Sequence, residues 1–442
     1  MPLPQNTFYK ISFSFFILPI YCILFSASCN SANKTDKAGK DNLIIFELPA
    51  PVPVPAAEAQ RIKINCRLWY DSVLKIKGFN GGIIVAKDGN IVFEQYRGTG
   101  HLPGNDTITQ NSPMHIASVT KTFTAMAVLK LQQDGKLNID DEFSKYFPAF
   151  NYPGITIRSL LSHRSGLPNY NYFMETLGWD KTRYVSNEDV LNYLITRKAE
   201  LADVLTPNTH FNYCNTNYAL LALLIEKVTG STYADHINKT FFIPLQMKNS
   251  YVFSLADTAK AIPSYNWRGG LETFTFLDQV YGDKNIYTTA RDLLIWDRAL
   301  SSNLLFTQET LDQAYAPYSN EKPGMRNYGL GWRMNIFPDG NRIIYHNGWW
   351  HGSNAAFIRL LNEKATIIVI GNKFTRSVYH AKVLTSIFGN YYSPDEEEES
   401  SLLKDLVPNT DSIPGRDTLQ THNSKKTKKV LPKKTGKGQK IA

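Results

Sequence analysis

The chain has 442 residues and 43% hydrophobic content, enough for a folded catalytic unit with its own core and flanking segments. Its net charge of +9 suggests a nucleic-acid partner, but eight of its 48 Lys and Arg lie between Lys425 and Lys440, where there is no Asp or Glu. Without these eight, 40 basic residues face 39 acidic ones, and the basic segment has no interleaved aromatic residues. The composition therefore excludes a basic nucleic-acid-binding body and predicts a charged, disordered tail over residues 393–442.

The N-terminus has the order of a secretory signal, because an uncharged apolar run follows Lys10 and ends in small residues before Cys29. This order predicts a signal peptide over residues 1–28 and export to the bacterial cell envelope. Small residues directly before a cysteine also resemble a lipoprotein site, where lipidated Cys29 would attach the protein to the membrane. Ser26 departs from that pattern, which usually has an aliphatic residue there, and an uncleaved N-terminal anchor is the alternative.

Residues 29–60 combine Lys, Asp and Ser with a proline-rich run, so we expect a disordered spacer there. The folded domain is expected over residues 61–392. Cys66 and Cys214 are its only cysteines, and the sequence leaves open whether they pair.

Strand-like patterns lie at both ends of this domain. A helix is predicted over residues 61–77, and two strands joined at Asp88-Gly89 follow it as a hairpin. Further strand-like segments and a final helix occur late in the chain, at residues 328–336, 341–346, 355–361, 365–371 and 376–391.

Helical periodicity dominates between these ends, with amphipathic stretches near 187–200 and 215–229. We therefore expect an α+β domain whose sheet part comes from about 61–110 and 282–392. The mostly helical part would cover about 111–281.

Ser118 and Lys121 lie three residues apart at the start of a long apolar helical stretch. Side chains at this spacing share a helix face, so the amine can reach the hydroxyl. Serine needs a base to take its proton, and lysine can be that base when its pKa is lowered by desolvation or positive potential. A helix cap is the alternative role for Ser118, but Lys121 opposes the helix dipole where a capping box would have Glu or Gln.

The Ser-x-x-Lys spacing alone is weak, because Ser31-Ala-Asn-Lys34 and Ser72-Val-Leu-Lys75 repeat it. The first lies in the spacer, and no long apolar helix follows the second. Context therefore favours Ser118 as the nucleophile.

Tyr213 and Asn215 stand two residues apart just before a predicted helix, so both can point into one cleft. A phenol can pass a proton, and an amide can bind a carbonyl group. The pattern recurs at Tyr318 and Tyr345, so a buried tyrosine beside an asparagine turn is the alternative.

A third motif, which contains His346 and Gly348, ends a predicted strand. A glycine leaves room for a substrate beside the strand, and a histidine offers a hydrogen bond or a positive charge. His351-Gly352 offers the same residue types, and a surface histidine without a function is the alternative.

Together the three motifs resemble the penicillin-recognising serine hydrolases, which include serine β-lactamases, D-alanyl-D-alanine carboxypeptidases, esterases and D-aminopeptidases. The resemblance covers about residues 75–392 and is strongest to the class C β-lactamase and carboxypeptidase branch. It includes, in the expected order, Leu160–Pro168, Ile243–Met247, Thr289–Leu293 and Tyr328–Trp332. It implies a β-lactamase-like fold, with an antiparallel sheet flanked by helices, a mostly helical subdomain and the active site at their interface.

The resemblance also implies roles for the catalytic residues. Ser118 would be the acylated nucleophile, Lys121 its general base, and Tyr213 the group that protonates the leaving group and helps activate water. Asn215 would position the substrate amide or ester. No metal ion or other cofactor is expected.

The third motif would contribute to substrate binding. His346 and Gly348 stand where many β-lactamases have Lys-Thr-Gly, and the oxyanion hole would be the backbone N–H groups of Ser118 and Trp349. Because His346 replaces a permanently charged lysine, we expect weaker, pH-dependent carboxylate recognition, which argues against an efficient β-lactamase. Trp349 and Trp350 follow where a small residue is usual, and they would narrow the cleft, form a hydrophobic subsite or pack on the sheet.

The sequence therefore predicts an exported serine hydrolase that cleaves amide or ester bonds in D-amino-acid peptide-like or related acyl substrates. One alternative is an esterase for small or lipidic acyl esters. Another is a catalytically inactive envelope-binding protein on the same scaffold, which the presence of Ser118, Lys121 and Tyr213 disfavours. No nucleic-acid partner is expected.

Overall fold

The computed structural model describes residues 44–202 and 204–391. The predicted signal peptide, the lipidation at Cys29, the start of the spacer and the C-terminal tail lie outside these residues. Within the described ranges, no helix has the length and apolar character needed to cross a membrane.

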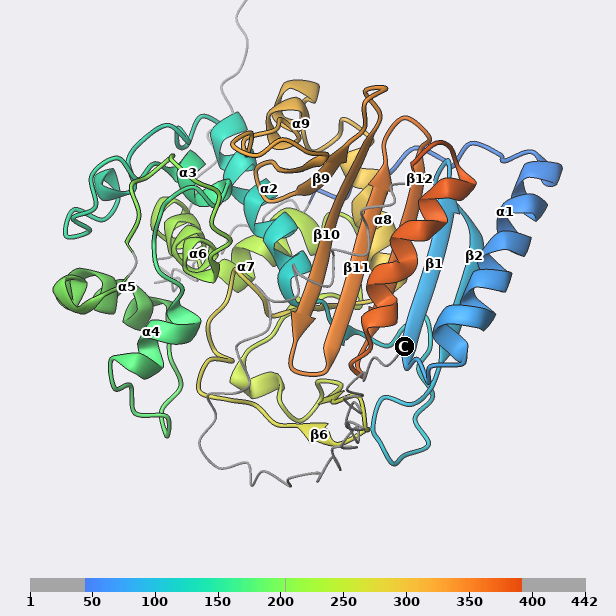
Figure 1. Cartoon of the computed structure of the whole chain (residues 1–442), viewed down its shortest axis with the longest axis horizontal. Helices are drawn as coiled ribbons and strands as arrows, with labels where there is room; N and C mark the ends of the chain where they lie inside the picture. The colour runs from blue at the N-terminus through green and yellow to red at the C-terminus, as the bar shows by residue number, and fades with distance from the viewer. Residues whose placement is uncertain (1–43, 203, 392–442) are drawn as a thin grey trace, which may run out of the picture. The chain divides into compact units, whose positions relative to one another are not determined.

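The largest sheet of the described residues has seven antiparallel strands in the order β2-β1-β12-β11-β10-β9-β8 (Figure 1). These strands are β1 (Gly81–Lys87), β2 (Asn90–Arg97), β8 (Arg326–Tyr328), β9 (Arg333–Ile336), β10 (Arg342–Trp350), β11 (Ser353–Leu360) and β12 (Ala365–Gly371). Strand β1 pairs with β12 along its whole length. The prediction of an α+β fold whose sheet is built from both ends of the chain is therefore confirmed.

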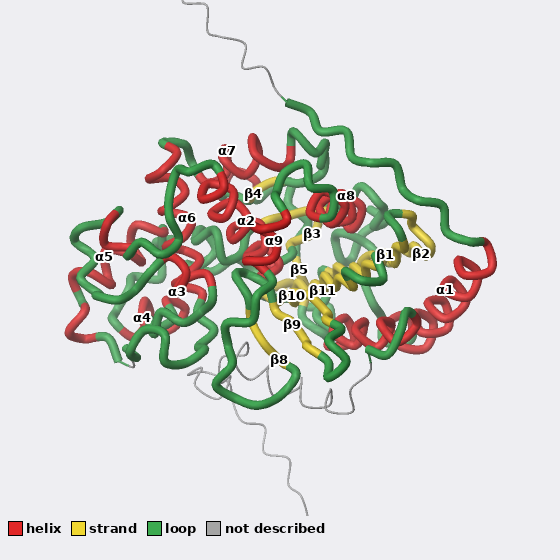
Figure 2. The backbone as a smooth tube through the Cα atoms, turned by 90° about the horizontal axis from the view of Figure 1, so that it is seen from above, coloured by secondary structure: helices red, strands yellow, loops and turns green. Residues whose placement is uncertain are grey.

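The central strands are largely apolar because both faces of the sheet are covered. Ile83 and Val85 belong to one buried cluster, whereas Ile84 and Ala86 belong to the other, as the two-residue period of a strand requires. Helices α1 (Ala56–Trp69) and η7 (Arg376–Ile387) pack in the first cluster, and α8 (Ala290–Leu300) packs in the second. Seen from above, α1 and α8 lie on opposite sides of the sheet (Figure 2).

The predicted hairpin forms between β1 and β2. Asp88 and Gly89 both have positive φ, at 51° and 78°. A two-residue turn of this kind matches the twist of the strands, and Asp-Gly tolerates the left-handed conformation at both positions.

The region between the two parts of the sheet is mostly helical. Its α-helices are α2 (Thr120–Gln133), α3 (Ile157–Leu161), α4 (Tyr170–Thr176), α5 (Asn187–Thr196), α6 (Asn215–Thr229) and α7 (Tyr233–Ile237), and α9 (Gln308–Ala314) follows α8. Helices α2 and α6 contact each other and are buried on nearly every side, which explains why their sequences are apolar rather than strictly amphipathic.

Short elements complete the described chain. The 3-10 and π segments are η1 (Tyr70–Lys75), η2 (Ala117–Val119), η3 (Phe143–Lys145), η4 (Lys198–Glu200), η5 (Asn238–Phe242) and η6 (Leu255–Asp257). Two small sheets consist of β3 (Met114–His115), β7 (Ile286–Thr288) and β4 (Tyr251–Val252), and of β5 (Ser264–Tyr265) and β6 (Leu271–Glu272). The pairing of β3 with β7 fixes the chain just before Ser118.

The expected spacer differs from the structure in its second half. Helix α1 begins at Ala56 rather than Arg61, directly after Pro55. Upstream of it, the backbone N–H of Phe46 donates to the Pro244 carbonyl at 2.9 Å. The Arg298 guanidinium donates to the Pro49 carbonyl at 2.8 Å in the same extended segment. Proline-rich composition was therefore a poor guide here, because an extended segment can satisfy its backbone groups against a folded body.

Candidate active site

The candidate nucleophile Ser118 lies in the 3-10 turn η2, which runs directly into α2. The serine thus precedes the α-helix instead of opening it. Ala117 has φ 47°, a left-handed conformation that costs a residue with a Cβ about 1–3 kcal/mol. Such strained turns cluster at functional sites, and this one holds a buried serine at the N-terminal end of α2.

Lys121 reaches back to this serine. Its Nζ lies 3.1 Å from Ser118 Oγ, 2.8 Å from Asn215 Oδ1 and 2.8 Å from the backbone oxygen of Asp283. The side chain is fully buried, and its three partners are neutral oxygens. This geometry holds the amine where it can accept the serine proton.

Tyr213 lies beside Lys121 in the extended chain that leads into α6. Lys121 Nζ is 5.0 Å from the centroid of the tyrosine ring, and the ring of His163 is 4.4 Å away. The phenol oxygen is buried and has no hydrogen-bond partner among the described residues. Because an unpaired buried hydroxyl is costly, this phenol is suited to bond a group that enters the site.

Asn215, the first residue of α6, orients the lysine. Its Oδ1 accepts from Lys121, and its Nδ2 donates to Asn171 Oδ1 over a long 3.3 Å contact. The oxygen is therefore already engaged, and only the weakly held Nδ2 could bind a substrate carbonyl.

Gly348 is the point where β10 packs against the nucleophile turn. A Cβ on this residue would lie 2.1 Å from the Ile116 carbonyl oxygen and 3.2 Å from the Ser118 backbone nitrogen. Strand β10 pairs with β9 only as far as Tyr345, so residues 346–350 have no strand neighbour on that side among the described residues. An open edge of this kind can align an extended substrate, and the two predicted oxyanion donors belong to the segments that meet here.

His346 lies in a buried setting. Burial first, and then the charges of Arg333 and Lys121, lower its pKa well below the ordinary value. Its Nδ1 is 2.7 Å from the Asn347 carbonyl, and its Nε2 is 3.2 Å from the Tyr328 hydroxyl, which fits a neutral ring with the proton on Nδ1. The buried setting therefore favours a neutral imidazole, and the role of His346 in substrate binding stays a prediction.

The two tryptophans have different surroundings because they lie on opposite faces of β10. Trp349 packs on Phe374, with ring centroids 5.7 Å apart, in the cluster beneath α1 and η7. Trp350 shares the face of Gly348, and its indole N–H donates to Asp278 at 2.5 Å. Trp349 therefore packs on the sheet, and Trp350 lies on the side of the nucleophile.

Arg333 is a site residue that sequence reasoning missed. Its guanidinium carbon lies 4.9 Å from the Tyr213 ring centroid and 5.9 Å from that of Tyr328. Within the described ranges no carboxylate pairs with it. Arg333 directly follows the Tyr328–Trp332 motif, and that position was the available signal for a permanent cation beside the phenol.

A second buried cluster supports the site from the far side of Lys121. Asp283, whose carbonyl binds Lys121, accepts a hydrogen bond from Tyr170 at 2.8 Å and lies 3.5 Å from Lys284 Nζ. Lys284 also donates to the Tyr170 hydroxyl, and burial lowers the pKa of this lysine. Tyr170 and Asp283 lie far apart in sequence, so no local pattern pointed to the cluster.

The two cysteines of the domain are free and buried. Cys66 lies in the cluster beneath α1, whereas Cys214 lies in the other cluster and donates from its thiol to the Pro168 carbonyl at 3.4 Å. The fold therefore uses no disulfide between them.

Comparisons with known proteins agree with this arrangement. The family model described as Beta-lactamase matches residues 74–388. The chain is 30% identical to penicillin-binding protein 4* of Bacillus subtilis over 72% of this chain and 74% of that protein. It is 26% identical to a D-aminopeptidase of Brucella anthropi over 67% of this chain and 56% of that protein.

A solved structure shares the fold. The penicillin-binding protein from Bacillus halodurans aligns with a TM-score of 0.63 at 22% identity, covering 72% of this chain and 98% of that one. The family match contains every motif from the nucleophile turn to the end of β10. On this combined sequence and structural likeness, the chain belongs to the Beta-lactamase family of penicillin-binding-protein-like serine hydrolases.

Proposed function

We propose that this serine hydrolase forms an acyl-enzyme on Ser118 and hydrolyses amide or ester bonds in D-amino-acid peptide-like acyl substrates. The observation that carries the proposal is the 3.1 Å contact between Lys121 Nζ and Ser118 Oγ, beside the unpaired phenol of Tyr213. The likeness to a D-aminopeptidase supports the substrate class.

In the proposed reaction, Ser118 Oγ attacks the substrate carbonyl carbon while its proton passes to Lys121 Nζ. Backbone N–H groups at the contact of η2 with β10 stabilise the tetrahedral oxyanion. When this intermediate collapses, the leaving amine or alcohol departs with a proton delivered by Tyr213, which regains one from Lys121, and a serine ester remains. Water then attacks the ester, releases the acid and restores the Ser118 hydroxyl.

Arg333 takes the role in carboxylate recognition that was expected of His346. It is a permanent cation beside Tyr213, where the leaving group departs, and no described carboxylate neutralises it. A free carboxylate on the leaving group would therefore bind Arg333.

The acyl-enzyme is tested by intact-mass detection of covalent adducts with a fluorophosphonate, penicillins, D-amino-acid peptides and acyl esters. Ser118→Ala should abolish the adduct, whereas Ser72→Ala, in a second Ser-x-x-Lys sequence, should leave it unchanged. Equal labelling of the Ser118→Ala protein would refute the proposal. An inactive binding protein would form no adduct with any probe.

An esterase remains a second candidate because of one observation, the packing of Trp350 against the hydrophobic core cluster on the nucleophile side of β10. The ratio of kcat/KM for an ester and an amide with the same acyl group separates the two. After allowance for the intrinsic reactivity of the ester, a preference for D-amino-acid amides supports a peptidase, and inactivity on amides supports an esterase.

We also propose that the protein is exported and attached to the membrane through lipidated Cys29. The support is the apolar run and the small residues that precede this cysteine. Cys29→Ala should move the protein from the membrane fraction to the soluble exported fraction and remove the lipid mass. Cys22→Ala is the matched control, and equal behaviour of both variants would contradict lipidation at Cys29.

A further inference from the structure

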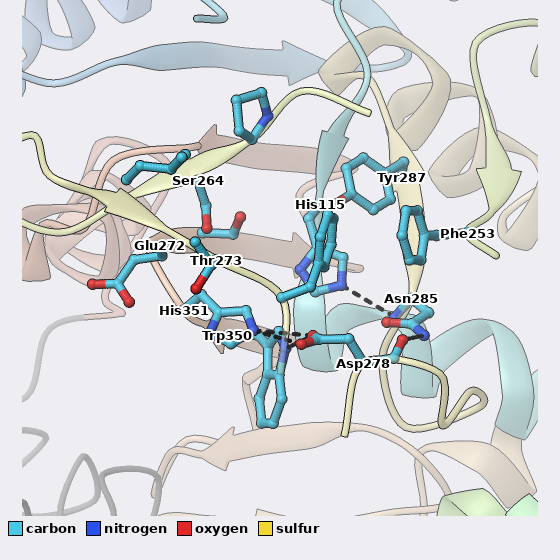
Figure 3. Close-up of a pocket in the computed structure, with 14 residues that line it drawn as sticks. His115, Phe253, Ser264, Glu272, Thr273, Asp278, Asn285, Tyr287, Trp350 and His351 are labelled. Carbon is cyan, nitrogen blue, oxygen red and sulfur yellow. Dashed lines mark hydrogen bonds and ion pairs between the residues drawn. The ribbon is translucent and has the colours of Figure 1, made fainter. Parts of the chain in front are cut away.

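A cavity of about 170 Å³ is lined on one side by His115, which precedes Ser118 by three residues, and on another by Trp350 of β10 (Figure 3). Four aromatic side chains line the cavity, namely Phe253, Phe274, Tyr287 and Trp350. No role in the proposed reaction has been assigned to it. Its volume is close to the roughly 150 Å³ of a protein cavity that accepts benzene.

The position of the cavity follows from the geometry of β10. His346, Gly348 and Trp350 share one face of the strand because successive side chains alternate. His346 adjoins Tyr213, with ring centroids 6.3 Å apart, and Gly348 packs on the Ser118 turn. Trp350 is therefore the next residue on the same face, and it lies farther along β10 from Tyr213 than His346 and Gly348 do.

The other wall of the cavity is also tied to the nucleophile. His115 lies three residues before Ser118 on β3, and its ring packs on Tyr287 with centroids 5.0 Å apart. The backbone N–H of Asn285 donates to His115 Nε2 at 3.2 Å. Both walls therefore belong to the segments that meet at Ser118, because His115 precedes this serine by three residues and Trp350 follows Gly348 by two.

The buried carboxylate in the wall is already paired. Asp278 accepts from the Trp350 indole and lies 3.0 Å from His351 Nε2 (Figure 3). Burial raises the pKa of Asp278, but the hydrogen bond and charge of His351 outweigh it and lower the pKa to about 2. Burial lowers the pKa of His115 to about 3, so its ring is neutral. Glu272 lies at the rim, and Figure 3 shows its carboxylate turned away from His115 and Tyr287.

We infer that this cavity binds the side chain of the substrate's acyl group and selects an uncharged aromatic group of phenyl size. The inference rests on the proposed acyl-enzyme function, because it is the departure of the leaving group toward Tyr213 that directs the acyl group toward Trp350. An aromatic wall whose buried carboxylate is already paired with His351 favours an aromatic ligand and disfavours a charged one.

The test compares two esters with the same leaving group, p-nitrophenyl phenylacetate and p-nitrophenyl acetate, which differ by one phenyl ring in the acyl group. The ratio of their kcat/KM values should favour phenylacetate by about tenfold or more. Thr273→Phe places a ring into the cavity from an exposed rim position and should bring the ratio down toward one. Thr182→Phe, at an exposed threonine outside the cavity, should leave the ratio unchanged.

An unchanged ratio in Thr273→Phe would overturn the assignment of the cavity while Ser118 acylation by both esters still supports the hydrolase. If neither ester acylates Ser118, the proposed function fails, and the cavity is then tested by binding alone. Phenylacetamide should bind Ser118→Ala protein at least tenfold more tightly than it binds the Ser118→Ala, Thr273→Phe double variant. Equal binding by the two proteins would refute the cavity assignment independently of catalysis.

Discussion

Two Ser-x-x-Lys sequences of this chain adopt helical structure but have opposite environments. Ser72 lies in η1, is exposed, and donates from its Oγ to the Leu68 carbonyl at 2.7 Å. Lys75 pairs with Asp71 at 3.1 Å on the surface. Ser118 and Lys121 are buried, and there the lysine contacts the serine itself.

The difference shows that spacing brings two groups within reach but does not make a catalytic pair. On the surface, a carboxylate and water compete for the lysine, and the helix backbone takes the serine hydroxyl. In the core, Asn215 and the Asp283 carbonyl leave Lys121 one remaining direction, toward Ser118. Environment therefore decides which copy of the motif can react.

The strongest test of this comparison replaces each lysine with a neutral side chain of similar length. Lys121→Met should lower kcat/KM by about a thousandfold, because no base remains at Ser118 Oγ. Lys75→Met should leave kcat/KM unchanged. Kinetics with one activated ester measure both, and urea denaturation verifies that the proteins are folded. Similar losses of kcat/KM in both variants would contradict the claim that only the buried Ser-x-x-Lys pair is catalytic.

Buried and exposed histidines extend the comparison to stability. Burial lowers the pKa of His115 to about 3, from the ordinary 6.5, and lowers those of His163 and His346 well below that value. Below pH 6.5 the unfolded chain therefore binds protons that the folded protein does not. The contribution of each such histidine to the unfolding free energy is complete above pH 6.5. As the pH drops below that value, this contribution falls by about 1.4 kcal/mol per pH unit.

Urea denaturation at pH 7.5 and 4.5 measures this effect. His115→Gln should reduce the fall in unfolding free energy by about 3 kcal/mol over this interval. His210→Gln, at an exposed histidine, should reproduce the fall of the unaltered protein. A fall that His115→Gln does not diminish would contradict the buried neutral state.

A smaller effect is expected from two arginines, of which one lies beside Tyr213 and the other is exposed on β10. Arg333→Gln should lower kcat/KM about tenfold for substrates with a carboxylate on the leaving group, because a charged hydrogen bond is lost. Neutral esters should change little. Arg342→Gln, on an exposed position of β10, should affect neither class. Equal losses for charged and neutral substrates would dismiss carboxylate binding by Arg333.

The smallest expected effect belongs to the surface motif itself. Ser72→Ala should change the unfolding free energy by less than about 0.5 kcal/mol, since the residue is exposed and bonds only within its own helix. Thermal denaturation of both proteins measures this difference. A loss of several kcal/mol would mean that the surface copy has a structural role.

Much of the fold was predictable because its signals are local. The Asp88-Gly89 turn, the strands that build β10 to β12 and the apolar stretch of α6 each follow from residues that are neighbours in sequence. The order of Ser118, Tyr213 and His346 was likewise visible. The packed segment before Ala56 was not predicted, because its partners Pro244 and Arg298 come from distant parts of the chain.

By itself, the sequence determined which chemical groups are present and in what order, since local periodicity and turn chemistry act over a few residues. Only the tertiary structure decided the protonation, the neighbours and the orientation of these groups. Burial makes His346 neutral, long-range packing brings Arg333 to Tyr213, and the alternation of β10 assigns Trp350 rather than Trp349 to the nucleophile side. Desolvation and contact between distant segments are properties of the folded chain, because they depend on which residues surround a group in space.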